Sequence, residues 1–349
     1  MSTRLSVIGL VLTALVLTTL VGNAQGVKPP PKVATSTGIY DVTSPDDIHK
    51  FSASEVRELV RMENRRYQGS STVPHPVLVY CFEERTFRYT GGKYKNAPIT
   101  YRLRTPQTIR SDQKYPLIVH LHGAGEAGSN NTSSLIHLHS ILPMMIGPEQ
   151  KDFFLLTTQC PSETPGWFFR PTKDGTLDVL MAAVEHVIAK NPIDETRITI
   201  TGVSSGGWGV WGALLKYPDF FAGAVPTACG APQYQRLAAL TQTPIWSFIN
   251  KGDIDPKSIL SAMSVINSSG GSMALTECNV RAHNAWKPAM EDYNALEWML
   301  AQKKGSLSPP PGVNRQIPFL LAFVLFVIPL SIIVFCLGKA VSDYVFSVY

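Results

Sequence analysis

A regular alternation of short apolar runs and amphipathic stretches, between residues 116 and 302, limits most strongly what this chain can fold into. Runs such as PLIVHL (116–121) and RITITG (197–202) have the length and β-branched content of buried strands. The stretch TLDVLMAAVEHVIAK (176–190) places apolar residues at the three- and four-residue spacing of a helix. Repeated strand–helix units predict an α/β fold with a doubly wound, mainly parallel sheet.

The remaining elements follow from the same patterns. Further strands are expected at 76–82, 85–90, 99–106, 153–159, 223–228, 244–250 and 273–278. Further helices are expected at 52–67, with Ser52 or Ser54 as N-cap, and at 208–218, 257–267 and 289–304.

The two ends of the chain are apolar in a different way. Residues 1–24 combine a basic Arg4, an apolar run and small residues at Gly22 and Ala24, which is typical of a cleaved signal peptide. An uncleaved N-terminal anchor is the alternative. Residues 317–337 are 21 uncharged residues, enough for a transmembrane helix. We therefore expect a single-pass membrane protein with its body on the exported (periplasmic or extracellular) side.

These segments divide the chain into successive parts. In order, they are a signal peptide (1–24), a lead-in (25–76), an α/β domain (77–304), a proline-rich stalk (305–316), the transmembrane helix (317–337) and a cytoplasmic tail (338–349).

Charge and cysteine content exclude several classes of function. Without Arg4, Lys339 and Asp343, the exported body carries 29 basic and 25 acidic residues, about +4, in no basic block, so a nucleic-acid partner is not expected. The chain has no CxxC motif, and no cofactor or metal is expected. One or two disulfides are permitted among the exported cysteines, which are Cys81, Cys160, Cys229 and Cys278.

The strongest chemical motif is G-x-S-x-G at residues 202–206, between an expected strand and an expected helix. This strand–turn–helix context is the one that a nucleophile elbow requires. Small residues must flank the serine because its backbone is held in a strained conformation. Ser204 is therefore the candidate nucleophile, against the alternative of a glycine-rich turn with an idle serine.

A nucleophilic serine needs a base and an orienting acid. His283 is the only histidine after Ser204, and it follows the expected strand 273–278. Asp253 follows the strand 244–250, and Asp255 in the same loop is its rival as the acid. Both loops lie at carboxyl ends of strands, where α/β sheets place their sites.

An oxyanion would be stabilised by two backbone amides, that of Ser205 and one in the loop after PLIVHL. Ala124 in the sequence HGAGE is the preferred second donor, with Gly123 as the alternative. Trp167 and Trp286 are candidates for the wall of a substrate pocket. Trp208 and Trp211 are expected to pack in the core.

Two H-x-H pairs, 120–122 and 137–139, suggest zinc, but no clustered carboxylate accompanies them and a metal site is not favoured. His186, on an amphipathic stretch, is expected to be structural.

The segments HLHGAGEAG, TTQCP followed by GWF, ITGVSSGGWGVWGALLKYPDFFAGAVPTACG and RAHNAW resemble the α/β-hydrolase esterases related to polyhydroxybutyrate depolymerases and to feruloyl and acetylxylan esterases. The resemblance runs from about residue 80 to 302 and is strongest to the bacterial group called predicted peptidases. It implies a metal-independent hydrolase with Ser204 as nucleophile, His283 as base and Asp253 as acid. Ile249-Asn250 stands where that family usually has His-Gly, and Ser205 is smaller than its usual counterpart.

These observations predict an exported, membrane-anchored serine hydrolase that cleaves small-molecule or polymer-derived carboxylic esters through an acyl-enzyme. The alternatives are a serine peptidase of the same fold and a catalytically silent, membrane-anchored binding protein.

Overall fold

The computed structural model describes residues 32–35, 38–41, 50–68, 74, 76–161, 176–232, 235–306 and 308–311. The expected signal peptide (1–24) and transmembrane helix (317–337) lie outside these residues. Within the part of the chain that is described, no helix is long and apolar enough to span a membrane.

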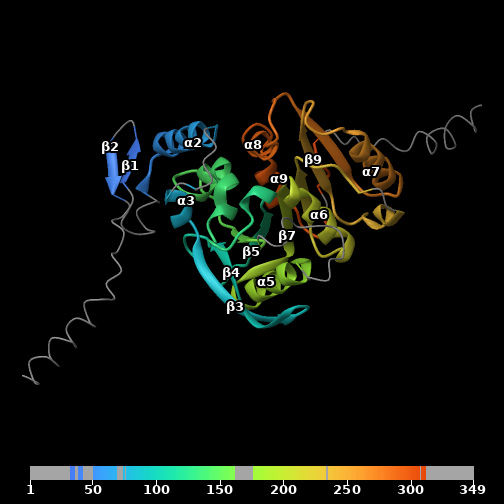
Figure 1. The fold of residues 1–349 in the computed structure, drawn as a ribbon, viewed down its shortest axis with the longest axis horizontal. Coiled ribbons are helices and arrows are strands. Elements are labelled where there is room, and N and C mark those ends of the chain that lie inside the picture. Colours follow the sequence, from blue (N-terminus) through green and yellow to red (C-terminus); the bar gives the residue numbers. More distant parts are fainter. Residues whose placement is uncertain are drawn as a thin grey trace, which may run out of the picture.

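Eight strands form one mixed sheet in the order β10-β9-β8-β7-β5-β6-β4-β3 (Figure 1). Their bounds are β3 Glu83–Gly91, β4 Tyr94–Arg104, β5 Tyr115–Leu121, β6 Phe154–Thr158, β7 Ile193–Val203, β8 Gly223–Thr227, β9 Ile245–Asn250 and β10 Met273–Cys278. The six strands β5 to β10 pair in parallel, and β3 and β4 add an antiparallel edge. The sheet confirms the mainly parallel α/β fold that the strand–helix alternation predicts, and it has the form of the α/β-hydrolase fold that the resemblance implies.

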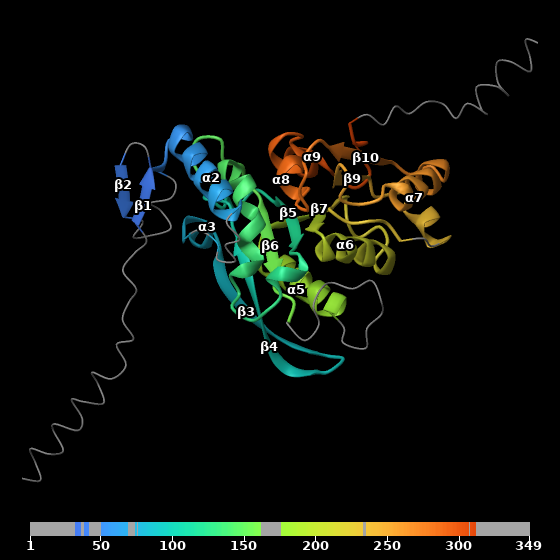
Figure 2. The ribbon, with the colours of Figure 1, turned by 45° about the horizontal axis from the view of Figure 1, so that its top comes forward.

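Strands β5, β6, β8 and β9 are buried on both faces, which explains why they are continuous apolar runs. One face packs against α5 (Thr176–Lys190), α6 (Ser205–Lys216) and α7 (Lys257–Ser268). The other face is covered by α2 (Ala53–Gln68), α3 (Pro76–Tyr80), η3 (Ser133–Ile141), α4 (Leu142–Met145), α8 (Trp286–Glu291) and α9 (Ala295–Ala301). Figures 1 and 2 show these two helical layers on either side of the sheet.

Helix α2 shows that part of the lead-in packs against the sheet's helical layer. The Ser52 amide donates to Glu55 Oε2 at 2.8 Å, and the Glu55 amide reaches the Ser52 hydroxyl at 3.4 Å. This capping box identifies Ser52, rather than Ser54, as the N-cap. Val56 and Leu59 are buried in the same apolar cluster as η3 and α8. The packed unit therefore includes residues that precede the expected boundary at residue 77.

Two elements differ from the sequence expectation. Residues 76–80 form the short helix α3 rather than a strand, with Val77 and Leu78 buried. Periodicity cannot separate a short apolar strand from a buried helical turn, and Pro76 at the helix start favours the helix. The single closing helix expected over 289–304 is instead α8 and α9, separated at Asn294, whose φ of 53° lies in the left-handed region.

Some smaller elements lie outside the main sheet. β1 (Lys32–Thr35) and β2 (Gly38–Asp41) form a separate antiparallel pair. Another short element, η4 (Gln235–Ala239), precedes β9.

The four cysteines that the structure describes are free thiols, so none of the permitted pairings among them is formed. They are Cys81, Cys160, Cys229 and Cys278. Burial raises the pKa of Cys81 to about 12 and that of Cys278 to about 11, which makes these thiols poor nucleophiles.

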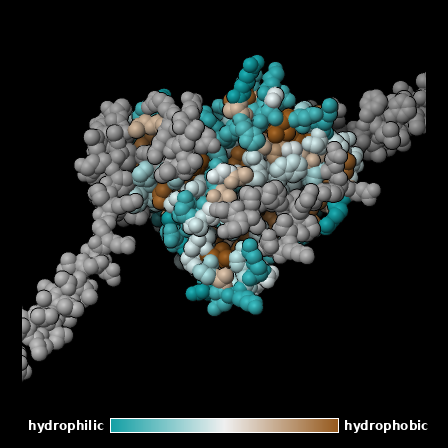
Figure 3. Space-filling model, in the orientation of Figure 1, coloured by the Kyte–Doolittle hydropathy of each residue, from teal (hydrophilic) through white to brown (hydrophobic). Residues whose placement is uncertain are grey.

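On the face shown in Figure 3, hydrophobic residues appear as small spots among polar ones.

Candidate active site

Ser204 occupies a strained turn between β7 and α6. Its φ of 56° and ψ of −114° are unusual for a residue with a side chain. A Cβ at Gly202 would lie 2.5 Å from the Gly206 backbone, and one at Gly206 would lie 2.1 Å from the Leu121 carbonyl oxygen. The two glycines thus let β7, α6 and the end of β5 approach closely around the serine, as the elbow motif predicts.

His283 joins the other two candidate catalytic side chains. Its Nε2 lies 2.8 Å from the Ser204 hydroxyl oxygen, and its Nδ1 lies 2.9 Å from Asp253 Oδ2 and 3.0 Å from Oδ1. The loop after β7 supplies Ser204, the loop after β9 supplies Asp253, and the loop after β10 supplies His283. The His283 side chain is 56% exposed, whereas that of Asp253 is 19% exposed.

Asp255 is used elsewhere. Its Oδ1 accepts the Lys257 amide at 3.0 Å at the start of α7, and its Oδ2 lies 3.5 Å from Lys257 Nζ. The hydrogen bond from the Lys257 backbone amide is the main reason why the pKa of Asp255 lies below its ordinary value. The structure therefore brings Asp253, and not its rival, to the imidazole.

The loop after β5, residues 122–128, lies beside the elbow; we call it the oxyanion loop. A Cβ at Gly123 would be 3.6 Å from the Val203 carbonyl oxygen, the residue before the serine. Ala124 begins the short helix η2 (Ala124–Glu126), and its side chain is exposed. Ser205 begins α6, whose N-terminal amides and dipole favour negative charge beside Ser204.

His122 fixes the base of the oxyanion loop. The Cys160 amide donates to its Nε2 at 2.9 Å, so the proton is on Nδ1, which donates to the Gly123 carbonyl oxygen at 2.6 Å. Burial lowers the pKa of His122 and favours this neutral form. Both ring nitrogens are thus committed to the backbone.

Glu126 provides a buried negative charge behind the same loop. Burial acts to raise the pKa of this carboxyl, but His137 and a hydrogen bond from the Gly123 backbone outweigh burial, so the pKa lies below its ordinary value. The Glu126 carboxylate is 3.5 Å from His137 Nε2. A Cβ at Gly123 would lie 2.7 Å from Glu126 Oε2, so this carboxylate lies directly behind the Gly123 backbone.

The predicted pocket tryptophans have different outcomes. Trp286 has no exposed surface and contacts His120 edge-to-face at 4.9 Å between ring centroids, so it is a core residue and the expected pocket wall is wrong. Apolar packing at the start of α8 explains its burial. Trp167 lies outside the described residues. Trp211 is buried, as expected, whereas Trp208 is 36% exposed, one helical turn after Ser204.

All four histidines of the H-x-H pairs are buried. The first pair lies at the end of β5, and the second lies in η3, on the face of the sheet opposite α6. His120 Nδ1 lies 3.4 Å from Thr157 Oγ1, and His139 Nδ1 lies 2.7 Å from the Ile136 carbonyl oxygen. Burial lowers the pKa of both. Within the described ranges, no three His, Cys, Asp or Glu side chains are grouped so that they could hold a metal ion. His186 stacks on Phe87 at 5.1 Å, in keeping with a structural role.

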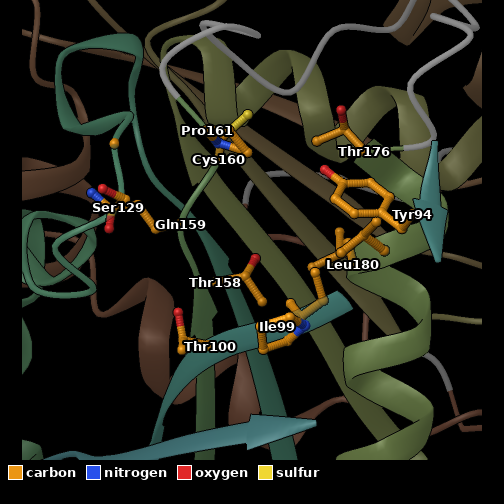
Figure 4. Close-up of a pocket in the computed structure, with 13 residues that line it drawn as sticks. Tyr94, Ile99, Thr100, Ser129, Thr158, Gln159, Cys160, Pro161, Thr176 and Leu180 are labelled. Atoms are coloured by element: carbon orange, nitrogen blue, oxygen red, sulfur yellow. The ribbon is translucent and has the colours of Figure 1, made fainter. Parts of the chain in front are cut away.

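Two cavities lie at the carboxyl edge of the sheet. The first, of about 220 Å³, is at the end of β6 and is shown in Figure 4. Its lining includes Tyr94, Ile99 and Leu180 as apolar surface and several hydroxyl-bearing residues, and none of the described residues in it carries a charged side chain. The second, of about 590 Å³, is more open and lies beside His283 and Asp253, with Lys251 and Arg281 in its wall.

Several residues near the site had no signal in local sequence patterns. Gln159, in the wall of the smaller cavity, donates to the Glu126 carbonyl oxygen at 2.8 Å. Asn250 donates to the Ala282 carbonyl oxygen in the loop that carries His283. Asn284, next to His283, contacts His137 at 3.3 Å. These contacts join segments that are far apart in the chain, so periodicity and spacing could not reveal them.

Comparisons with known proteins agree with this architecture. A family model described as "Prolyl oligopeptidase family" matches residues 168–246, which include the elbow. The structure of a thermostable esterase is similar with a TM-score of 0.57 and 28% identity, covering 65% of this chain and 64% of that one. The chain thus spans slightly less than two thirds of that protein's length. A search of curated proteins found no match.

Two further solved structures have lower similarity. The acylaminoacyl peptidase of Pyrococcus horikoshii has a TM-score of 0.48 and 15% identity, covering 65% of this chain and 43% of that one. A fluorophosphonate-binding serine hydrolase of Staphylococcus aureus, FphF, has a TM-score of 0.47 and 13% identity, with 63% and 99% covered.

Proposed function

We propose that this chain is a serine hydrolase that cleaves carboxylic esters through an acyl-enzyme. The observation that carries the proposal is the continuous hydrogen-bonded series from Ser204 through His283 to Asp253, placed at a nucleophile elbow. The similarity to a thermostable esterase, at 28% identity, supports the ester as substrate.

In the proposed mechanism, each group has its own step. Ser204 Oγ attacks the ester carbonyl carbon while His283 Nε2 takes the hydroxyl proton, and Asp253 stabilises the imidazolium through Nδ1–H. The tetrahedral intermediate collapses, the C–O bond to the alcohol breaks, and His283 returns the proton to the departing alcohol oxygen. Water then attacks the acyl-enzyme, again giving its proton to His283, and the carboxylic acid leaves as Ser204 is regenerated.

The amides of Ala124 and Ser205 are proposed to bind the oxyanion of each tetrahedral intermediate. They come from two sides of the nucleophile, the oxyanion loop and the first turn of α6. The α6 N-terminus adds to the stabilisation because its dipole points positive charge at the same place. Loss of one such donor costs on the order of 10²–10³ in turnover.

The smaller cavity is the proposed site for an uncharged part of the substrate. Apolar cavities of about 150 Å³ accept a benzene ring, so its volume of about 220 Å³ suits a group of one-ring size. Strands β5 and β6 are neighbours, and β7 follows β5, so β6 ends about 10 Å from the elbow strand. Trp167 remains a proposed part of the substrate wall. The relation to polyhydroxybutyrate depolymerases and to feruloyl and acetylxylan esterases is part of this proposal.

A serine peptidase is the second candidate, because a prolyl oligopeptidase family model matches the segment around Ser204. Esters and amides react through the same acyl-enzyme. A catalytically silent binding protein is the remaining alternative.

We also propose that the catalytic body is exported and anchored in the membrane by residues 317–337, after removal of the signal peptide at residues 1–24. The absence of charge over those 21 residues supports the anchor. Membrane fractionation with protease protection would test it: a body that is accessible only from the cytoplasmic side would contradict the proposal.

Reaction of the purified protein with a fluorophosphonate probe tests the hydrolase. We expect covalent labelling at Ser204, and none in Ser204→Ala. No labelling of the folded wild-type protein would support the silent binding protein. Values of kcat/KM for p-nitrophenyl acyl esters and for short peptides then separate esterase from peptidase, and we expect the esters to be preferred.

A further inference from the structure

Behind the proposed site, one polar network connects the oxyanion loop to the loop that carries His283. We call the latter, residues 279–285, the base loop. Glu126 belongs to the oxyanion loop, His137 to η3, and Asn284 to the base loop. His137 lies between the other two, with Nε2 3.5 Å from Glu126 Oε2 and Nδ1 3.3 Å from Asn284 Nδ2.

The direction of the hydrogen bonds follows from the Asn284 carboxamide. Its Oδ1 accepts the Trp286 amide at 3.0 Å and the Lys287 amide at 3.4 Å, at the start of α8. With the oxygen held by these amides, Nδ2 is the group that faces His137. It must donate to Nδ1, so the His137 proton is on Nε2, the ring nitrogen that lies 3.5 Å from Glu126 Oε2.

Burial makes this arrangement selective. The side chains of His137 and Glu126 are only 5% and 14% exposed. In surroundings with little water, replacing a polar group leaves its partner unsatisfied, and the loss is larger than at the surface. The network therefore holds both loops with few alternative partners.

Both ends of the network adjoin groups of the proposed mechanism. Glu126 is two residues from Ala124, and its carboxylate lies against the Gly123 backbone, with Oε2 2.7 Å from where a Cβ at Gly123 would be. Asn284 directly follows His283, whose Nε2 is 2.8 Å from the Ser204 hydroxyl oxygen. A shift of about 1 Å in such a group can cost about 10²-fold in rate.

We propose that Glu126, His137 and Asn284 are positioning residues that couple the oxyanion loop to the base loop, so that the oxyanion amide and the general base keep a common geometry around Ser204. This inference rests on the proposed function for its catalytic readout. His137 contacts neither substrate nor reacting atoms, so its effect passes through the two loops.

A double-mutant cycle tests the coupling. We would measure kcat and KM on p-nitrophenyl acetate for wild type, Glu126→Gln, Asn284→Ala and the double variant, each normalised to the fraction titrated by a fluorophosphonate. Each single variant should lower kcat about 10- to 100-fold, with little change in KM. The kcat of the double variant should be only slightly lower than that of the less active single variant, because both substitutions break the same connection.

Controls separate positioning from general stability. Glu149→Gln removes an exposed carboxylate that pairs with Arg57, and His186→Gln removes a histidine outside the site. Both should stay within about twofold of wild type. His137→Gln, whose carboxamide can donate to Glu126, should retain more activity than His137→Ala.

Two kinetic results would overturn the proposal: single effects that multiply in the double variant, or variants that lose only the titratable fraction while kcat per site is unchanged. Hydrogen–deuterium exchange tests the coupling without catalysis, because Glu126→Gln should raise exchange in the base loop. Unchanged exchange there would also contradict it. An inactive wild type with the expected exchange would contradict the proposed function and leave the coupling supported.

Discussion

The histidines at the carboxyl edge of the sheet occupy two contrasting settings. His283 is 56% exposed and its Nε2 faces a hydroxyl proton that can be transferred. His120, His122, His137 and His139 are buried, and their described contacts are with backbone groups or fixed side chains. A ring whose nitrogens are held by fixed partners positions the chain, whereas a ring with one nitrogen on a mobile proton can act as a base.

The contrast also explains why the H-x-H pairs are misleading. Both pairs belong to the buried set, and His122 uses its two nitrogens to hold Gly123 and Cys160. The lone histidine after the elbow, without any motif around it, is the one that reaches the nucleophile. Exposure and partner, rather than local spacing, separate the two settings.

The largest effect should come from His283. We expect His283→Gln to lower kcat/KM on a p-nitrophenyl ester by about 10⁴- to 10⁶-fold, because no other described histidine is placed to take the Ser204 proton. The midpoint of urea unfolding should change little, since the side chain is exposed. Retention of more than a tenth of the activity would mean that the exposed ring is not the base.

The next largest effect should come from Asp253, the proposed acid that orients the exposed histidine. We expect Asp253→Asn to lower kcat by about 10⁴-fold, because the amide would favour the wrong tautomer of His283. Asp255→Asn serves as the matched control and should stay within about threefold, since it only caps α7. The assignment would be reversed by a larger loss in the Asp255 variant.

The sequence predicts those elements of the fold and those residues of the candidate site whose signals lie within a short stretch of the chain. Apolar periodicity predicts α5 and the strands of the sheet, although it wrongly predicts a strand at residues 76–82. The elbow is predictable from the two glycines that flank Ser204. The base was predictable because His283 has no rival after Ser204.

Other features depend on contacts that are not local. The choice of Asp253 over Asp255 depends on the turn at Gly252, where φ is 77°. The burial of Trp286 and the contact of His137 with Asn284 depend on how α8 packs on η3. Such packing joins segments about 150 residues apart, so a pattern within a short stretch of sequence cannot reveal it.

A substitution in the buried set should affect folding first. His122→Phe replaces the imidazole by a phenyl ring, which has no nitrogen atoms. The Cys160 N–H and the Gly123 carbonyl are then left without their partner. We expect the free energy of unfolding to fall by about 1–3 kcal/mol, measured by urea denaturation, with a smaller catalytic loss from the displaced oxyanion loop. Unchanged stability together with complete inactivity would place His122 in the chemistry instead, and His186→Phe provides the control outside the site.

The smallest effect per group is the response of stability to pH. Burial lowers the pKa of His120, His122 and His139 in the folded protein, whereas in the unfolded chain it lies near 6.5. Below pH 6.5 the unfolded state therefore binds more protons, and the free energy of unfolding should decrease as the pH falls. Each such histidine contributes at most about 1.4 kcal/mol per pH unit, until the pH reaches its folded pKa. Urea denaturation between pH 7.5 and 5 measures the slope, and His139→Gln should make it shallower. An unchanged slope in His139→Gln would contradict the assignment of these buried histidines to the neutral form.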